Sequence, residues 1–149
     1  MVPGAAFAIS FLRIDCLLAG CCAGSTSQLP WAMTFPAGSR PWYEQLQAGV
    51  LSPGAVASLP VHPLQIYFLL LSLALGLFAL WWLPRKSYDG QVVLFFLALH
   101  EGGKFLLEFL RYPPLPAIQI ASLAVSLTAT LALVAIWARG RLQAPVVTT

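Results

Sequence analysis

The sequence predicts an all-α integral membrane protein, a bundle of about four transmembrane helices with one long loop on the outer face. Of the 149 residues, 59% are hydrophobic and only 9% are charged, whereas soluble domains carry about 25% charged residues. Two stretches long enough to cross a bilayer, residues 64–83 and 116–138, contain no charged side chain. The formal net charge of +3 comes from scattered cations, so we expect no nucleic-acid partner.

Two further apolar stretches, residues 3–24 and 91–110, contain ionisable side chains. We expect both to be spanning helices, and we expect the first to end at Gly24, because glycine often follows a helix. A charge at membrane depth costs on the order of 3 kcal/mol unless it is paired or hydrated. The charged faces of these two helices should therefore meet inside the bundle.

The remaining segments complete a single transmembrane domain over residues 1–141. Residues 25–63 form the predicted outer loop, whose aromatic side chains favour contact with the membrane surface. Residues 142–149 are expected to be a disordered tail. Because cations follow the second and fourth spans, both termini are assigned to the cytoplasm. These cations are Arg85, Lys86, Arg139 and Arg141.

A row of ionisable side chains follows one helical face in and just beyond residues 91–110, at spacings of three and four. The row consists of His100, Glu101, Lys104, Glu108 and Arg111. One interpretation is a ladder of ion pairs that only neutralises its own charges. The other is an anion site in which Lys104 and Arg111 hold a phosphate and Glu108 orients them. Intramembrane charge usually has a use, which favours the anion site.

Arg13 is the key residue of the first span. Asp15 lies close to it in the sequence, but side chains two positions apart on a helix point in different directions. We therefore expect the partner of Arg13 to lie on another helix or to be a lipid phosphate.

Three cysteines, Cys16, Cys21 and Cys22, follow Arg13. They contain no C-x-x-C pair, and a disulfide between adjacent cysteines would be strained. We therefore expect them to pack as small residues rather than to carry thiol chemistry, and we expect no metal site.

The entrance to the second span is polar, with His62 before Pro63 and with Gln65 and Tyr67 after it. A histidine at a helix start is often only a cap or a surface residue. Here it would lie at headgroup depth on the same side as Arg111, where it could act on a substrate. Both interpretations remain open from the sequence.

Several segments, in this order along the chain, resemble the prolipoprotein diacylglyceryl transferase family. They are Arg13-Ile14 with Gly20 and Gly24, then Leu29-Pro30-Trp31-Ala32 and Phe35-Pro36, then His62-Pro63-Leu64-Gln65-Ile66-Tyr67, then Asp89-Gly90 leading to Lys104-Phe105-Leu106-Leu107-Glu108-Phe109-Leu110-Arg111, and finally Gln119 and Ser122. Each segment is a weak signal alone, and the ordered set is more specific.

The resemblance implies a multi-pass enzyme of the bacterial inner membrane. Its activity would be transfer of a diacylglyceryl group from phosphatidylglycerol to the cysteine thiol of a prolipoprotein signal peptide, without a metal or cofactor. The implied partners are phosphatidylglycerol, the prolipoprotein and the surrounding membrane lipids. The implied catalytic residues are Arg13, His62, Lys104, Glu108 and Arg111, and the implied substrate-binding residues are Gly24, Gln65, Tyr67 and His100. Either His62 or His100 would serve as the base.

The sequence also departs from the family pattern. Cys16 and Cys21 stand where the family signature has asparagine and glutamate, and Lys104 stands where its late helix has arginine. An early His-Gly-Gly element is absent from the sequence. These departures keep a second interpretation open, in which the chain is a non-catalytic membrane homologue that binds phospholipid or a partner protein. A membrane thiol oxidoreductase is a third, disfavoured by the lack of a separated cysteine pair.

Overall fold

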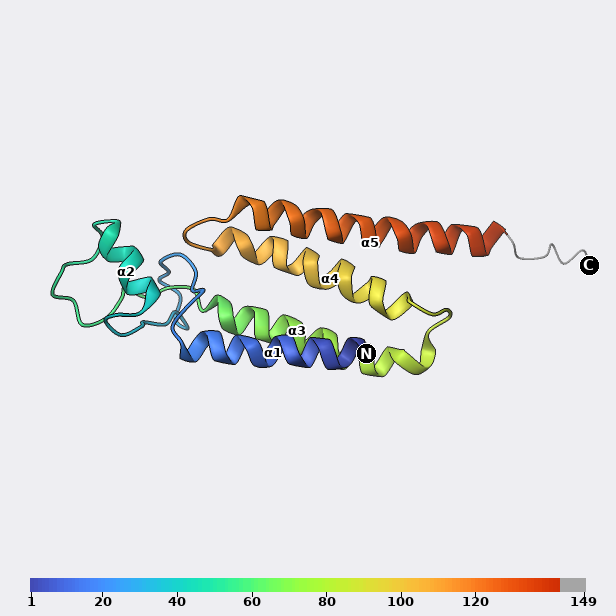
Figure 1. Cartoon of the computed structure of the whole chain (residues 1–149), viewed down its shortest axis with the longest axis horizontal. Coiled ribbons are helices and arrows are strands. Elements are labelled where there is room, and N and C mark those ends of the chain that lie inside the picture. Colours follow the sequence, from blue (N-terminus) through green and yellow to red (C-terminus); the bar gives the residue numbers. More distant parts are fainter. Residues whose placement is uncertain (143–149) are drawn as a thin grey trace, which may run out of the picture.

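The computed structural model describes residues 1–142 and is helical throughout its regular structure (Figure 1). Its four long helices and three short ones are α1 (Val2–Leu18), α2 (Arg40–Gln47), α3 (Leu64–Trp82), η1 (Leu83–Arg85), α4 (Gln91–Leu107), η2 (Glu108–Leu110) and α5 (Pro116–Leu142). Within the described residues, β structure is limited to isolated bridges. Apart from Leu142, which is the last residue of α5, the predicted tail lies outside the described residues.

The long helices form two pairs, α1 with α3 and α4 with α5, and α3 joins the pairs by packing against α4 (Figure 1). Small residues allow these close approaches. A Cβ on Gly76 of α3 would lie 3.0 Å from the Cβ of Ala6 in α1, and a Cβ on Gly103 of α4 would lie 2.7 Å from a side-chain carbon of Leu71 in α3. A larger residue at Gly76 would press on Ala6, and one at Gly103 would displace the Leu71 side chain, so both glycines allow the close packing of these helices.

Two helical segments are long and apolar enough to cross a bilayer, Leu64–Arg85 and Pro116–Arg139, with mean hydropathies of 2.2 and 2.1. Only 22% and 11% of their most apolar windows are buried inside the protein. The core helix of a soluble protein would be covered, whereas these side chains face outward, as lipid-exposed helices do. The all-α membrane class is therefore confirmed. The crossings by α1 and α4, and with them the four-span bundle, stay predictions.

The prediction that the first helix ends at Gly24 is wrong, because α1 ends at Leu18. Gly20 has a positive φ of 61°, and the backbone N–H of Cys21 donates to the carbonyl of Cys16 at 3.0 Å. The N–H of Gly20 itself donates to the carbonyl of Leu17. This is the Schellman arrangement, which ends a helix at a left-handed residue. The earlier of two glycines therefore stops the helix.

Residues 25–63, predicted to be an outer loop, contain the helix α2 and a small packed core. Pro41 lies in the first turn of α2, where its missing N–H costs nothing, and Arg40 pairs with Glu44 one turn later. Phe35 and Val61 of this segment form a buried hydrophobic cluster with Ala23, which lies just before it. We call residues 19–63 the lobe; it lies at the end of the helix pairs opposite the N-terminus (Figure 1).

The third predicted span, residues 91–110, also ends differently from the expectation of one continuous helix. α4 stops at Leu107, and the chain continues as the tighter 3₁₀ turn η2 over Glu108–Leu110. Such turns are common at helix ends, and this one brings Arg111 back beside Glu108.

Candidate functional site

Gly24 is the point at which three segments of the predicted site meet. Its backbone N–H donates to the carbonyl of His62 at 2.9 Å, the N–H of Ser25 donates to the carbonyl of Leu110 at 2.7 Å, and Gly24 forms a bridge with Arg111. A Cβ on Gly24 would lie 2.7 Å from both the His62 Cβ and the Leu110 oxygen. Gly24 therefore lets the lobe, the start of α3 and the end of η2 come together.

The first cluster of ionisable side chains lies on α4 and faces α3. The Nδ1 atom of His100 lies 3.0 Å from Glu101 Oε1, and Lys104 Nζ lies 3.2 Å from Glu101 Oε2. The other ring nitrogen of His100 lies 3.2 Å from the hydroxyl of the buried Ser72 in α3. Because an ionised carboxylate only accepts hydrogen bonds, we assign the Nδ1 proton to the bond with Glu101. His100 therefore has both ring nitrogens engaged.

The second cluster joins Glu108 and Arg111 across η2. The Glu108 side chain is buried, with the residue only 3% exposed, and its carboxylate pairs with Nε of Arg111. Cys22 lies beside the same guanidinium and interacts with it. Arg111 is thus held by a buried carboxylate and by the bridge to Gly24, which fixes it at the junction of lobe and helices.

The third cluster lies at the start of α3. His62 Nδ1 lies 3.4 Å from the hydroxyl of Tyr67, and that hydroxyl accepts a hydrogen bond of 2.8 Å from Trp31 Nε1. Gln65 is 1% exposed, and its Nε2 donates to the backbone carbonyl of Cys21 at 2.5 Å. His62, Gln65 and Tyr67 therefore tie α3 to the lobe as well as being candidates for substrate contact.

Arg13 has a different environment from the other cations. Its guanidinium carbon lies 4.6 Å from the centre of the Phe68 ring on α3. Across the described residues, no carboxylate forms an ion pair with Arg13, and this includes the nearby Asp15. The expectation of a partner on another helix is confirmed in the form of an aromatic ring, which attracts a cation through its face.

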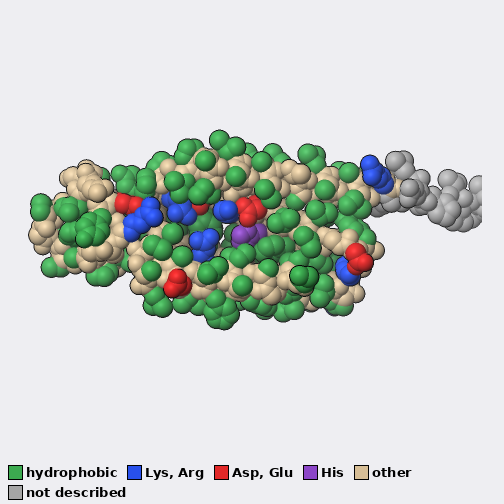
Figure 2. All heavy atoms as spheres, viewed as in Figure 1, with side chains coloured by type: hydrophobic (Ala, Val, Ile, Leu, Met, Phe, Trp, Pro, Cys, Tyr) green, Lys and Arg blue, Asp and Glu red, His purple; other side chains and the backbone are tan. Residues whose placement is uncertain are grey.

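Charged side chains gather in a band across one otherwise hydrophobic face, between the two helix pairs (Figure 2). The predicted row on α4 and η2 is divided into two clusters, each with its own carboxylate. Ser72 and Phe68 were not predicted as part of this region. Ser72 could have been found, because a serine within an apolar span commonly bonds to a neighbouring helix. Nothing in the sequence marks Phe68 among the many phenylalanines.

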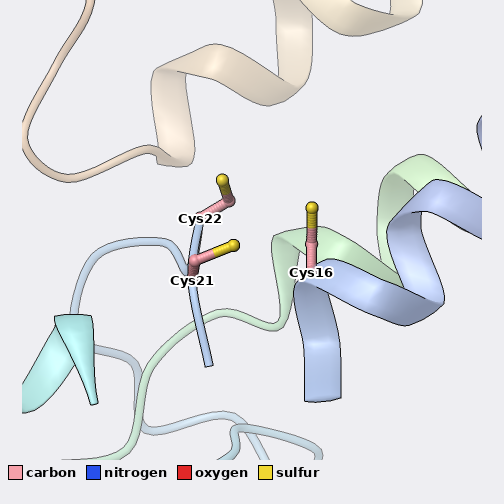
Figure 3. Close-up of side chains that lie close together, drawn as sticks. All are labelled: Cys16, Cys21 and Cys22. Carbon is pink, nitrogen blue, oxygen red and sulfur yellow. The ribbon is translucent and has the colours of Figure 1, made fainter. Parts of the chain in front are cut away.

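The three cysteines lie at the end of α1 and just beyond it, and their Sγ atoms are all within 4.8 Å of one another (Figure 3). All three are free thiols. Burial raises the pKa of the Cys21 thiol, which follows the end of α1, to about 12, and Cys22 and Cys16 act in the same direction. A thiol with this pKa stays protonated near neutral pH and is a poor nucleophile.

Outward-facing apolar helices, together with ion pairs held by the neighbouring helices, define an integral membrane protein with a charged site. The chain belongs to the prolipoprotein diacylglyceryl transferase family, whose model matches residues 1–139. A relative from Clostridium perfringens (strain 13 / Type A), named phosphatidylglycerol–prolipoprotein diacylglyceryl transferase 2, is 35% identical over 122 residues, covering 82% of this chain and 42% of that protein. A relative from Clostridium tetani (strain Massachusetts / E88), named phosphatidylglycerol–prolipoprotein diacylglyceryl transferase, is 32% identical over 114 residues, covering 76% of this chain and 40% of that protein.

A third relative with the latter name, from Bordetella avium (strain 197N), is 41% identical over 92 residues, which are 60% of this chain and 28% of that protein. The chain thus spans about two fifths of the length of the two clostridial relatives. No solved structure matches the chain.

Proposed function

We propose that this chain transfers a diacylglyceryl group from phosphatidylglycerol to the cysteine thiol of a prolipoprotein signal peptide. The observation that carries the proposal is the placement of His62 and the Glu108–Arg111 pair at the junction around Gly24, in a chain that belongs to this family. The names of the relatives supply the substrate class. The chain resides in the bacterial inner membrane, with four crossings in a single domain over residues 1–141 and with both termini in the cytoplasm.

The balance of charge supports an anionic lipid as the ligand. Three cations, Arg13, Lys104 and Arg111, belong to the proposed site, and two carboxylates, Glu101 and Glu108, pair with two of them. One positive charge remains, on Arg13, and a single phosphodiester would neutralise it. Desolvated cations also stabilise the charge that develops on a departing phosphate.

The base in this proposal is His62. His100 has Glu101 on one ring nitrogen and Ser72 on the other, so it is held as a positioning residue for Glu101 and Lys104. For His62, only Nδ1 has a side-chain partner among the described residues, the hydroxyl of Tyr67. With the Nδ1 proton directed at that hydroxyl, Nε2 keeps a lone pair that can accept the thiol proton.

The chemistry is a displacement at carbon. The acceptor thiol gives its proton to His62, and the thiolate sulfur attacks the glyceryl carbon. A carbon–sulfur bond forms while the carbon–oxygen bond to phosphate breaks, and glycerol phosphate leaves with the electron pair. Arg13, Lys104 and Arg111 stabilise the phosphate. Gly24, Gln65 and Tyr67 shape the place where lipid and peptide meet.

Transfer of labelled lipid tests this function directly. Membranes that contain this chain as their sole candidate transferase are supplied with phosphatidylglycerol labelled in its acyl chains and with a lipobox peptide. We expect label on the peptide, and no label on a matched peptide whose lipobox cysteine is serine. Absence of label on the cysteine peptide, with the chain folded and inserted, would contradict the proposal.

A non-catalytic lipid-binding homologue is the second candidate, favoured by the two signature positions at which cysteine stands, Cys16 and Cys21. The same membranes distinguish the two functions. A homologue of this kind retains anionic lipid in an Arg13-dependent manner and labels neither peptide.

A further inference from the structure

The three cysteines form a compact group of sulfur atoms that the proposed transfer does not use. Cys16 belongs to the last turn of α1, and the Schellman turn places Cys21 directly after it, with the Cys21 N–H bonded to the Cys16 carbonyl at 3.0 Å. Cys22 adopts a positive φ of 59°, which is uncommon for a residue other than glycine. The backbone thus brings the three side chains together, with Cys21 directed toward Cys16 (Figure 3).

The surroundings of the sulfur group are ordered and polar. Gln65, 1% exposed, holds the Cys21 carbonyl through Nε2, while its Oε1 atom has no hydrogen-bond partner among the described residues. Two cations interact electrostatically with the cysteines. Arg111 interacts with Cys22, and Arg40 interacts with both Cys21 and Cys22. The hydrogen bond from Gln65 holds the backbone of Cys21, and therefore the position of its side chain, at the end of α1.

We propose that Cys16, Cys21 and Cys22 bind one soft monovalent metal ion, of which Cu(I) is the probe, through their three sulfur atoms. Each thiol releases its proton to solvent as its sulfur binds the ion. With metal–sulfur bonds of about 2.3 Å, a trigonal site requires sulfur–sulfur separations of about 4 Å. The Sγ atoms already lie within 4.8 Å of one another, so closure needs only small rotations of the side chains.

The donor set selects the class of ion. Thiolate sulfur prefers soft ions such as Cu(I), whereas Zn²⁺ in a structural site normally has four protein ligands. Within the described residues, the group contains three sulfurs and no histidine or carboxylate as a fourth member. Three thiolates around a monovalent ion carry two negative charges, and Arg111 and Arg40, each also paired with a carboxylate, are the cations that act on this group. A disulfide would instead require an oxidant and would leave one sulfur over.

Direct binding tests the proposal independently of the transferase activity. The full chain, reduced and purified in detergent without oxygen, is titrated with Cu(I) against a chromogenic Cu(I) chelator. We expect one ion per chain, with X-ray absorption giving three sulfur neighbours at about 2.3 Å. Each of the substitutions Cys16→Ser, Cys21→Ser and Cys22→Ser should weaken Cu(I) binding by at least about 100-fold. Mutation of residues that only hydrogen-bond to metal ligands already lowers metal affinity by about 10- to 100-fold, and loss of a ligand should cost more.

Met33→Leu is the matched control, since it removes another sulfur near the lobe core and should leave binding unchanged. Cysteine alkylation in the parent chain gives a second test that does not depend on the folding of the variants. Bound Cu(I) should protect all three thiols from reaction with a maleimide. The proposal is overturned by full binding in the triple serine variant, by one or two sulfur neighbours, or by unprotected thiols in the presence of Cu(I). Tighter binding of Zn²⁺ than of Cu(I) would also overturn it.

Discussion

Single residues of the proposed site differ in how their charge is balanced. Lys104 and Arg111 each contact a carboxylate, whereas Arg13 lies over the ring of Phe68. An aromatic face offsets only part of the cost of a desolvated cation. Arg13 is therefore the cation that gains most from a lipid phosphate, and it offers the most informative substitution.

Arg13→Ala should abolish lipid transfer while the protein still inserts, because loss of one oriented contact to the developing charge costs about 3 kcal/mol or more in the transition state. Arg13→Lys should rescue poorly, since an ammonium cannot form a bidentate pair with phosphate. Transfer and anionic-lipid binding are measured in nanodiscs. Arg40→Ala is the control, because Arg40 is an exposed arginine paired with Glu44 in the lobe. Parental activity in Arg13→Ala would mean that Arg13 is structural.

Gly24→Ala should destabilise the protein by about 1–3 kcal/mol, the usual cost of forcing an extra carbon into a packed region. The added methyl would meet the Leu110 carbonyl and the His62 Cβ at 2.7 Å. Thermal unfolding in detergent measures this effect. Gly54→Ala is a matched control in the same lobe, where a Cβ has nothing within 4 Å. Equal melting temperatures for the two variants would contradict the junction described for Gly24.

At the scale of the element, α4 packs its aromatic Phe95 against Trp82 of α3 and places the polar His100 against Ser72 of the same helix. The carboxylate of Glu101 holds two neighbours at once, His100 and Lys104. The 3₁₀ turn η2 then redirects the chain, so Arg111 points back to Glu108. The helix and its turn therefore position two separate cations.

Lys104→Arg should retain transfer within a few-fold of the parent, because arginine can pair with both Glu101 and a phosphate and stands at this position in the family pattern. Lys104→Met should lower transfer by about 100-fold or more, since a positioned charge near the leaving group is lost. Initial rates of lipid transfer in nanodiscs give both values. If the methionine variant transferred as fast as the arginine variant, Lys104 would only neutralise Glu101.

The helices also separate what sequence patterns can and cannot locate. The apolar stretches predicted α3 and α5 closely, because hydrophobic length is a property of the segment alone. The end of α1 was misplaced, because both Gly20 and Gly24 suit a helix stop. The helix α2 was missed because it has only a short amphipathic pattern, and packing in the lobe stabilises it.

At the scale of the whole molecule, the arrangement places the lobe and the proposed site at one end of the helix pairs and the Arg85–Lys86 turn at the other (Figure 1). Reporter fusions after Lys86 and after Arg141 should therefore report the cytoplasm, and fusions at Gly49 and Pro114 the outer face. Phosphatase and fluorescent-protein reporters give opposite signals on the two sides, so each position is tested twice. A cytoplasmic signal at Gly49 would invert the topology and place the lobe inside the cell.

The sequence by itself determined the membrane class, the positions of the apolar helices and the identity of the ionisable residues, because these depend on composition and on spacing along one helix. The pairing of Arg13 with Phe68, of His100 with Ser72 and of Gly24 with Arg111 was decided by the tertiary structure. Each of these contacts joins residues far apart in the chain. Local patterns carry no information about the distance between such residues, whereas helix packing fixes that distance.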